Sequence, residues 1–369
     1  MKVPFLDLSF TTGLIKKDYL LEVNEFLDRN QFILTQEVSD FENAWAKYVD
    51  VRYCIGVSSG SDALYLALVA CGINSGDEVI IQGNAYNACV TAIIHAGGVP
   101  RFVDIDSESL CLDTSKITPL INSKTKAIMP VHLYGQACPM DEIMDIAKKH
   151  NLRVVEDCAQ AHGAVYKDKH VGSFGDAGAF SFYPTKNLGA FGDAGAVVTD
   201  DEQIFTKIIA LRNLGQISKN DHRYFGLNMR LDSIHAIALK LKLKKFQEVT
   251  EFRKKAGEYY EKLFREMNLQ VKTLKTNSYS TNVYHLYVIW NYGMDRDKLR
   301  KKLIERGVET AIHYPVPVYN QPFYQEQKKD PCPVTNRVLN EIVSLPMFYG
   351  ITTEQQHYVV ETLASILHA

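Results

Sequence analysis

From residue 53 to about residue 200, short apolar runs alternate with longer stretches of helical periodicity. The apolar runs, predicted as strands, are YCIGV (53–57), VII (79–81), RFVDI (101–105), AIMPV (127–131), RVVED (153–157), AFSF (179–182) and GAVVT (195–199). The predicted helices between them cover residues 62–71, 86–96, 114–122 and 140–150. Strands that alternate with helices predict βαβ units and therefore a mostly parallel sheet flanked by helices, an α/β fold.

The pattern changes after about residue 240. Apolar residues at helical spacing run from 231 to 267, which predicts one long helix. Beyond it, YHLYVIW (284–290) predicts a strand, and residues 297–306 and 354–368 predict helices. We therefore expect a large domain over residues 1–240, N-terminal helical segment included, and a long helix with a small α+β domain over residues 241–369.

Composition and charge narrow the classes of function. Apolar residues make up 46% of the chain and charged residues 23%, as in globular proteins. The 41 basic and 43 acidic residues leave a net charge of −2, which argues against nucleic-acid or membrane binding through bulk charge. The start of the chain lacks the pattern of a signal peptide, and no apolar run approaches the roughly 20 residues that span a bilayer. We expect a cytoplasmic protein.

The cysteines suggest no cross-linked or metal-bound framework. There are seven of them, an odd number, scattered along the chain without a C-x-x-C pair. Neither a disulfide scaffold nor a zinc site has this spacing, so no metal site is predicted from them.

The first candidate site is the segment SSGSD (58–62), which connects a predicted strand to a predicted helix. A glycine allows close approach of the backbone, and free N–H groups at the start of a helix attract an anion, so the segment suits a phosphate group. It matches neither the dinucleotide-binding nor the Walker pattern. A plain turn with a Ser/Asp helix cap is the alternative interpretation.

The second candidate lies where the predicted strand 153–157 ends. Glu156 and Asp157 close that strand, and Gln160 and His162 follow. Carboxylates at the carboxyl ends of parallel strands lie where α/β sheets bind ligands. A metal bound by Asp157 and His162 is conceivable, but the pair lacks a third ligand.

The third candidate is Lys186, in the segment SFYPTKNLGAFGDAG (181–195). It follows a predicted strand in a loop rich in Gly, Pro and Asn. A lysine that forms a covalent bond to a ligand must be held rigidly and must be partly deprotonated by its surroundings. A solvated surface charge is the alternative.

These three segments occur in the order found in pyridoxal-phosphate (PLP) enzymes of the aspartate-aminotransferase fold, fold type I. The segments VVEDCAQAHGA (154–164), SFYPTKNLGAFGDAG and GLNMRLD (226–232) resemble signature segments of the sugar-nucleotide aminotransferases of the DegT/StrS type. The similarity covers most of the chain, including VPFLDL (3–8), IHYPVP (312–317) and SLP (344–346).

The resemblance implies a role for each matching residue at the cofactor. Lys186 would bind PLP covalently and, once released, carry the proton between the substrate carbon and the cofactor. Asp157 would keep the pyridine nitrogen protonated, and Gln160 would hydrogen-bond the ring hydroxyl. Tyr86 would stack on the ring, unless it is a core aromatic residue. The phosphate would be bound by Gly60, Ser61, Asp62 and Ser181.

The resemblance also implies a homodimer with shared active sites. Asn228, in the G-x-N-x-R pattern, resembles the residue that reaches the phosphate of the neighbouring subunit. Arg230 is our candidate for binding the donor carboxylate; a structural ion pair at the subunit interface is equally compatible with its position. The segment QGNA (82–85) departs from the Pro-Ser-Asn-Thr that is usual at this place in the family. It lacks the threonine hydroxyl, so a polar contact by that hydroxyl is not expected here.

The implied reaction is transamination from L-glutamate to a nucleotide-linked keto sugar. Tyr183, His313 and Tyr314 resemble acceptor-side residues of the branch that acts on dTDP-linked 3-keto-6-deoxyhexoses, which would give a dTDP-3-amino-3,6-dideoxyhexose. With Lys186 and Asp157, Tyr183 and His313 complete the predicted catalytic set, although His313 could be a packed loop residue.

Three alternatives remain open. One is a 4-keto acceptor linked to UDP, GDP or dTDP. Another is a dehydratase of the same fold, against which Lys186 argues because those relatives carry histidine in its place. The third is a non-catalytic sensor of PLP or of a sugar nucleotide.

Overall fold

The computed structural model describes residues 1–276, 280–290, 292–324 and 331–368. The helices are α1 (Ser9–Gly13), α2 (Lys16–Asp28), α3 (Gln36–Val49), α4 (Gly60–Ala70), α5 (Asn87–His95), α6 (Met140–His150), α7 (Glu202–Leu211), α8 (Ser233–Leu243), α9 (Phe246–Glu266), α10 (Arg296–Glu305), α11 (Pro333–Glu341) and α12 (Thr353–Leu367). The strands are β1 (Tyr53–Val57), β2 (Glu78–Gln82), β3 (Val99–Val103), β4 (Thr125–Met129), β5 (Arg153–Asp157), β6 (Val165–Tyr166), β7 (Lys169–His170), β8 (Ala177–Ser181), β9 (Gly195–Thr199), β10 (Gln216–Ser218), β11 (Asp221–His222), β12 (Lys272–Thr273), β13 (Tyr287–Trp290) and β14 (Val343–Leu345). Short 3₁₀ turns occupy Thr114–Lys116, Thr118–Leu120, Leu133–Gly135, Val318–Asn320 and Pro322–Tyr324.

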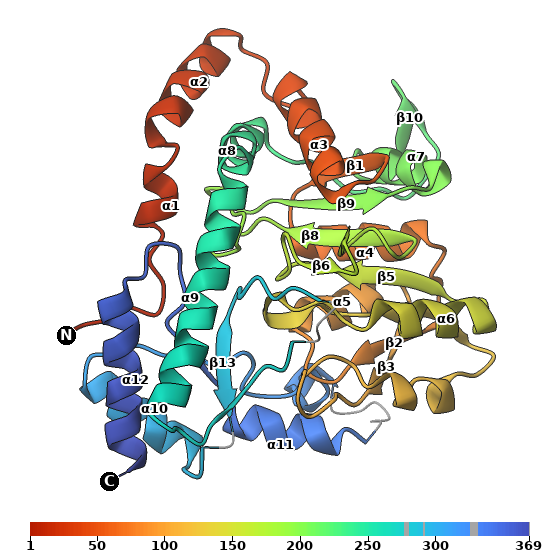
Figure 1. Ribbon diagram of the computed structural model, residues 1–369. Helices are drawn as coiled ribbons and strands as arrows, with labels where there is room; N and C mark the ends of the chain where they lie inside the picture. Colours follow the sequence, from red (N-terminus) through yellow and green to blue (C-terminus); the bar gives the residue numbers. More distant parts are fainter. Residues whose placement is uncertain (277–279, 291, 325–330, 369) are drawn as a thin grey trace.

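A seven-stranded sheet forms the centre of the molecule (Figure 1), with the strand order β1-β9-β8-β5-β4-β2-β3. All neighbours from β8 to β3 are parallel, whereas β9 is antiparallel to both β1 and β8. This confirms the mostly parallel sheet. Because β5 and β8 are adjacent and parallel, their carboxyl ends, Asp157 and Ser181, lie at the same edge of the sheet.

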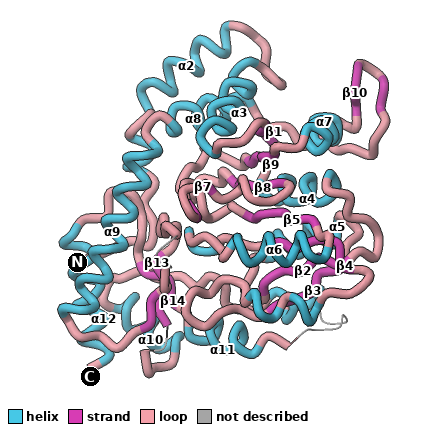
Figure 2. The backbone as a smooth tube through the Cα atoms, turned by 45° about the vertical axis from the view of Figure 1, so that its right-hand side comes forward, coloured by secondary structure: helices cyan, strands magenta, loops and turns pink. Residues whose placement is uncertain are grey.

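Both faces of the sheet are covered by helices (Figure 2). Alternate residues of a strand face opposite sides, so Val79 and Ile81 of β2 join one core cluster while Ile80 joins the other. The first cluster includes apolar residues of α4, α5 and α7, and the second includes those of α3, α6 and α8. Burial on both faces explains why the strands consist of nearly continuous apolar residues.

A second, smaller unit is built around the antiparallel strands β12, β13 and β14. Helices α9, α10 and α12 pack on it around a core cluster of their own, which also contains Val3. Val3 forms a β-bridge with Val308, and both ends of the chain lie on this side of the molecule (Figure 1). The segment around Val3 therefore packs with the small unit, whereas α2 packs on α8.

Three predicted elements were wrong in extent. The long helix 231–267 consists of α8 and α9, separated at residues 244–245, because α8 packs on α2 and α3 whereas α9 packs on α12. The helix at 114–122 consists of two short 3₁₀ turns, the second containing Pro119, which cannot donate a helical hydrogen bond. The strand at 284–290 begins only at Tyr287, since Tyr284 has a φ of +44°.

No helix among the described residues is both long and apolar enough to cross a membrane.

Candidate active site

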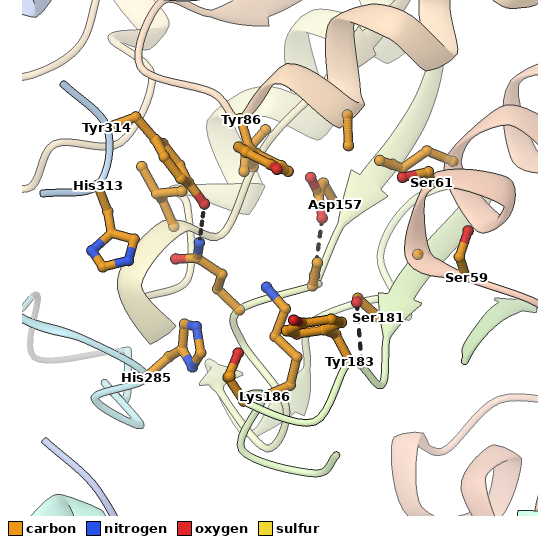
Figure 3. A pocket seen from close by; sticks show the side chains of 18 of the residues that line it. Ser59, Ser61, Tyr86, Asp157, Ser181, Tyr183, Lys186, His285, His313 and Tyr314 are labelled. Carbon is orange, nitrogen blue, oxygen red and sulfur yellow. Dashed lines mark hydrogen bonds between the residues drawn. The ribbon is translucent and has the colours of Figure 1, made fainter. Parts of the chain in front are cut away.

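A cavity of about 430 Å³ lies at the carboxyl ends of β5 and β8, beside the start of α4 (Figure 3). Most of the residues predicted from the sequence line it, although they come from distant parts of the chain. These are Gly60, Ser61, Tyr86, Asp157, Gln160, Ser181, Tyr183, Lys186, His313 and Tyr314.

One end of the cavity is formed by the start of α4. Ser59 is the N-cap residue of this helix, and its hydroxyl accepts a hydrogen bond from the backbone N–H of Asp62 at 3.1 Å. A Cβ atom at Gly60 would lie 2.5 Å from the Cβ of Ser181, so only glycine lets the helix approach β8 this closely. The serine hydroxyls and the positive end of the helix form a cradle suited to a phosphate group.

Asp157 is held in place at the end of β5. Its Oδ1 accepts a hydrogen bond from the backbone N–H of Ala159 at 2.9 Å, and its Oδ2 accepts one from the thiol of Cys89, also at 2.9 Å. Burial, and next the nearby Asp157 charge, raise the pKa of Cys89 well above its usual value. Cys89 therefore remains a protonated donor, and both carboxylate oxygens keep a fixed orientation.

Lys186 lies on a tightly closed loop between β8 and β9. Its backbone N–H donates to the carbonyl of Tyr183 at 2.9 Å, and the N–H of Ala190 donates to that of Phe182 at 2.8 Å. A Cβ atom at Gly189 would lie 2.5 Å from the carbonyl oxygen of Pro184, so the loop closes over a glycine. Burial lowers the pKa of the Lys186 amine, with the negative charge of Asp157 opposing this shift in part. The loop thus holds the lysine rigidly, and burial shifts its pKa in the direction that a covalent lysine needs.

Tyr86 and Tyr314 lie along the upper side of the cavity in Figure 3, and Gln160 also lines it. Tyr86 immediately precedes α5, and its ring stacks on that of Tyr314 with centroids 4.7 Å apart. The amide nitrogen of Gln160 donates to the hydroxyl of Tyr314 at 2.9 Å, and its oxygen accepts from the backbone N–H of Tyr134 at 2.8 Å. Gln160 therefore joins strand β5 to the segment around Tyr314.

His313 lies at the opposite end of the cavity from the serine cradle (Figure 3). Its Nδ1 is 2.8 Å from the hydroxyl of Ser344, and its ring stacks on Phe5. Burial, and then the positive charge of Lys186, lower the pKa of His313 to about 4, so its ring is neutral at physiological pH. Tyr183, on the loop of Lys186, is about half exposed and borders the same space.

Three predicted site residues lie away from the cavity lining. The carboxylate of Asp62 accepts hydrogen bonds from the hydroxyls of Ser58 at 2.5 Å and Ser59 at 2.9 Å at the helix start. Asn228 is exposed on the surface, and the guanidinium of Arg230 donates to the side chain of Asn213 at 3.2 Å. Their predicted roles remain predictions.

The segment 82–85 also lies outside the lining. The amide of Gln82 donates to Asn84 at 2.8 Å and accepts from the backbone N–H of Val131 at 3.1 Å, and all three residues are buried. These side chains support the loop after β4.

Nine residues of the lining were not among the predicted site residues, and four of these nine are polar: Ser59, Thr185, Asp193 and His285. The first three lie within the segments 58–62 and 181–195 that the sequence had already singled out, and could have been included on that ground. His285 lies within the run YHLYVIW, where the apolar pattern predicted only a strand. Nothing in the local sequence marks it as a cavity residue.

The metal alternative based on Asp157 and His162 finds no support. Among the described residues, the group close enough to hold an ion is His132, Glu156 and Cys158. The imidazole of His132 is already used, because its Nε2 is 3.0 Å from Glu156 and its Nδ1 accepts from the backbone N–H of Cys138 at 3.0 Å.

The lining fits PLP in both shape and charge. A serine-rich helix start suits the phosphate, the oriented carboxylate of Asp157 suits a protonated pyridine nitrogen, and Lys186 has the lowered pKa that a covalent lysine needs. A mostly parallel sheet with these groups at its carboxyl edge is the arrangement that the resemblance implied, that of a PLP-dependent enzyme of the aspartate-aminotransferase fold.

Comparison with known proteins identifies the family. The chain belongs to the DegT/DnrJ/EryC1/StrS aminotransferase family, whose profile matches residues 14–364. It is 40% identical over 361 residues to the dTDP-3-amino-3,6-dideoxy-alpha-D-galactopyranose transaminase of Aneurinibacillus thermoaerophilus, with 98% of each chain covered. It is also 39% identical over 367 residues to a "pleiotropic regulatory protein" of Geobacillus stearothermophilus, covering 99% of this chain and 98% of that protein.

A solved structure agrees with this assignment. The crystal structure of S. venezuelae DesV in complex with a ketimine intermediate superposes with a TM-score of 0.95 at 34% identity, covering 100% of this chain and 99% of DesV. The chain is thus a PLP-dependent sugar aminotransferase.

Proposed function

We propose that this enzyme transfers the amino group of L-glutamate to a dTDP-linked 3-keto-6-deoxyhexose and forms a dTDP-3-amino-3,6-dideoxyhexose. The observation that carries the proposal is the 40% identity, over nearly the whole chain, to a transaminase named for dTDP-3-amino-3,6-dideoxygalactose. A 4-keto sugar nucleotide remains the alternative acceptor.

The proposed roles follow from the positions of the side chains. PLP supplies an electron sink for the electron pair left when the substrate carbon loses its proton. Asp157 holds the proton on the pyridine nitrogen, because its oriented oxygens stabilise a cation beside them. The amine of Lys186 takes and returns the substrate proton, and burial favours its unprotonated form by lowering its pKa. Ser61 and Ser181 bind the phosphate.

Glutamate and the sugar nucleotide must use the cavity in turn, because both react at the same position of the cofactor. Binding of glutamate therefore needs a cationic side chain for its carboxylate, and this side chain must not be required when the sugar nucleotide is bound. We assign this role to Arg230, whose guanidinium forms no ion pair among the described residues and donates to the neutral amide of Asn213. A guanidinium binds a carboxylate through two parallel hydrogen bonds.

The proposal includes a homodimer in which Asn228 completes the site of the neighbouring subunit. The segment that carries Asn228 exposes a group of large apolar side chains: Leu214, Ile217, Tyr224, Phe225 and Leu227. Phe225 is fully exposed, and the hairpin β10–β11 beside it projects from the large domain (Figure 1). An exposed apolar group of this size is typical of a protein–protein interface.

A substrate panel tests the reaction. The purified enzyme is incubated with PLP, L-glutamate and one keto sugar at a time, linked to dTDP, UDP or GDP, and the product is identified by NMR. We expect release of 2-oxoglutarate and an amine at carbon 3 of a dTDP-sugar. An amine at carbon 4 would contradict the regiochemistry, and binding without turnover of any keto sugar would favour a regulatory role.

Subunit mixing tests the shared site. Lys186→Ala and Asn228→Ala are each expected to be inactive or severely impaired as homodimers. After subunit exchange, a heterodimer should contain one site with both residues intact, so activity should partly return. Mass spectrometry confirms that the subunits have exchanged. If activity does not recover in the exchanged sample, Asn228 does not act across the interface.

A further inference from the structure

His285 lines the cavity and has no role in the reaction described above. Figure 3 shows its ring pointing into the cavity between Lys186 and His313, at the end opposite the serine cradle. The residue comes from the segment that leads into β13, about 100 positions after Lys186 in the sequence.

The backbone of His285 is held by a buried arginine. Arg253 of α9 donates to the carbonyl oxygens of Tyr284 at 3.1 Å, His285 at 2.8 Å and Met347 at 3.2 Å. The guanidinium is buried, and among the described residues it donates to these carbonyl groups. Three bonds to two separate segments fix the position from which the imidazole enters the cavity.

The side chain of His285 is also fixed, by its contact with Asn187. The amide nitrogen of Asn187 donates to the carbonyl of Val283 at 3.2 Å, so the amide oxygen faces the ring of His285. The Nδ1 of His285 lies 3.1 Å from this oxygen. Because an amide oxygen only accepts, Nδ1 must carry the hydrogen, and Nε2 of the neutral ring is then an acceptor.

The surroundings of His285 keep the ring neutral. Burial, followed by the positive charges of Lys186 and Arg253 and the rings of His313 and His162, lowers its pKa well below the usual value. No described residue forms a hydrogen bond with Nε2 in the structure, so this lone pair is available to a ligand in the cavity.

We propose that His285 is a specificity-determining residue whose Nε2 accepts a hydrogen bond from a hydroxyl group of the bound sugar. The position fits this role because the other end of the cavity, with the serine cradle and Asp157, suits the cofactor. Glutamate has no hydroxyl to donate, so the contact would act in the sugar half of the reaction. This inference rests on the sugar substrate of the proposed function.

Two substitutions of His285 test the roles of the two imidazole nitrogens separately. In His285→Asn, the new amide nitrogen lies near the former Nδ1 and keeps the bond to Asn187, whereas the acceptor at Nε2 is lost. In His285→Gln, the amide oxygen reaches the position of Nε2 and restores an acceptor. Each half-reaction is followed separately through the absorbance of the bound cofactor, with L-glutamate or with dTDP-3-amino-3,6-dideoxygalactose as the amino donor.

We expect His285→Asn to lower the second-order rate constant of the sugar half-reaction roughly tenfold, because one hydrogen bond contributes about that much. The second-order rate constant of the glutamate half-reaction should change less than about twofold. His285→Gln should recover most of the loss. Calorimetry should show that the cofactor-free protein binds the same dTDP-sugar most tightly as the wild type, less tightly as His285→Gln and least tightly as His285→Asn. Equal slowing of both half-reactions, or equal loss in both variants, would overturn the proposal.

Asn187→Asp provides an independent test. A carboxylate beside Nδ1–H stabilises the protonated ring and raises the pKa of His285, which removes the acceptor at Nε2 as the pH falls. The sugar half-reaction of this variant should decline toward acidic pH relative to the wild type, while the glutamate half-reaction should not. An unchanged pH profile would contradict the proposal. If the wild type does not react with the dTDP-sugar at all, the proposed substrate is wrong, which is a separate outcome.

Discussion

The two ends of the cavity are built in different ways. The cofactor end consists of segments at the edge of one sheet: the start of α4 and the carboxyl ends of β5 and β8. The opposite end consists of His285 and His313, which come from the small unit, and Tyr314, which Gln160 connects to the large sheet. The first end is carried by one rigid element, whereas the second depends on how two units pack.

This difference shows which side chains of the cavity must be positioned accurately and which can shift without loss of the chemistry. Groups at the ends of adjacent strands are fixed by the backbone hydrogen bonds of the sheet, so chemistry that needs an accurate geometry is placed there. Groups that recognise a variable substrate lie on the other side, where loops can change without disturbing the sheet. We therefore expect substitutions at the cofactor end to affect both half-reactions, and those at the opposite end to affect one.

The largest effect is expected for Lys186→Ala. Removing the amine takes away both the covalent link to PLP and the group that moves the proton, so turnover should fall below detection in both half-reactions. The measurement is turnover together with reduction by borohydride, which traps PLP on the lysine of the wild type only. A variant that still retains PLP covalently after borohydride would show that another lysine holds it.

Asp157→Asn should have the second largest effect. The substitution keeps the shape and the bond from Ala159 but removes the charge that stabilises a protonated pyridine nitrogen. We expect both half-reactions to slow by a factor on the order of 10²–10³, as for other pre-organised electrostatic partners. Single-turnover absorbance measures each of them. A change in one half-reaction only would contradict the comparison between the two ends.

Cys89 allows a finer test at the same end. Cys89→Ala leaves Oδ2 of Asp157 buried without its donor, which should cost about 2 kcal/mol in the rate of both half-reactions. Cys89→Ser keeps a donor and should lie close to the wild type. The matched control is Cys138→Ala, a buried thiol whose bonds are to Val131 and Gln82. If the serine and alanine variants behave alike, the thiol does not orient Asp157.

The smallest effect concerns stability and not turnover. His162 is fully buried among Trp45, Phe180 and Phe182, and burial lowers its pKa to about 3. Between pH 6.5 and 3 the unfolded chain takes up a proton that the folded chain does not, so stability falls as the pH decreases. Between pH 7.5 and 5.5 this proton uptake lowers the free energy of unfolding by ~1.4 kcal/mol.

His162→Phe should remove that contribution. Thermal unfolding at pH 7.5 and 5.5 measures it, and the variant should lose less stability between the two pH values than the wild type. An identical loss in both proteins would mean that His162 does not titrate in this range.

Much of the cofactor end could be predicted from the sequence. Asp157 was a candidate because it ends an apolar run and Lys186 because it follows a strand in a loop rich in Gly, Pro and Asn, but their roles came from the resemblance to the family. Such signals are local: a strand end or a helix start is fixed by a few consecutive residues, and the topology of a parallel sheet brings those ends to one edge. The alternation of strands and helices likewise predicted the sheet, but not the break between α8 and α9, because that break depends on which helices they contact.

The sequence by itself therefore determined the fold class, the family and the residues that follow strands or begin helices. Only the tertiary structure decided which distant side chains complete the site. Cys89 meets Asp157 from 68 positions away, and His285 meets Asn187 from 98 positions away. Neither pair leaves a periodic or compositional signal, because their contact results from the packing of α5 against the sheet and of the small unit against the large one.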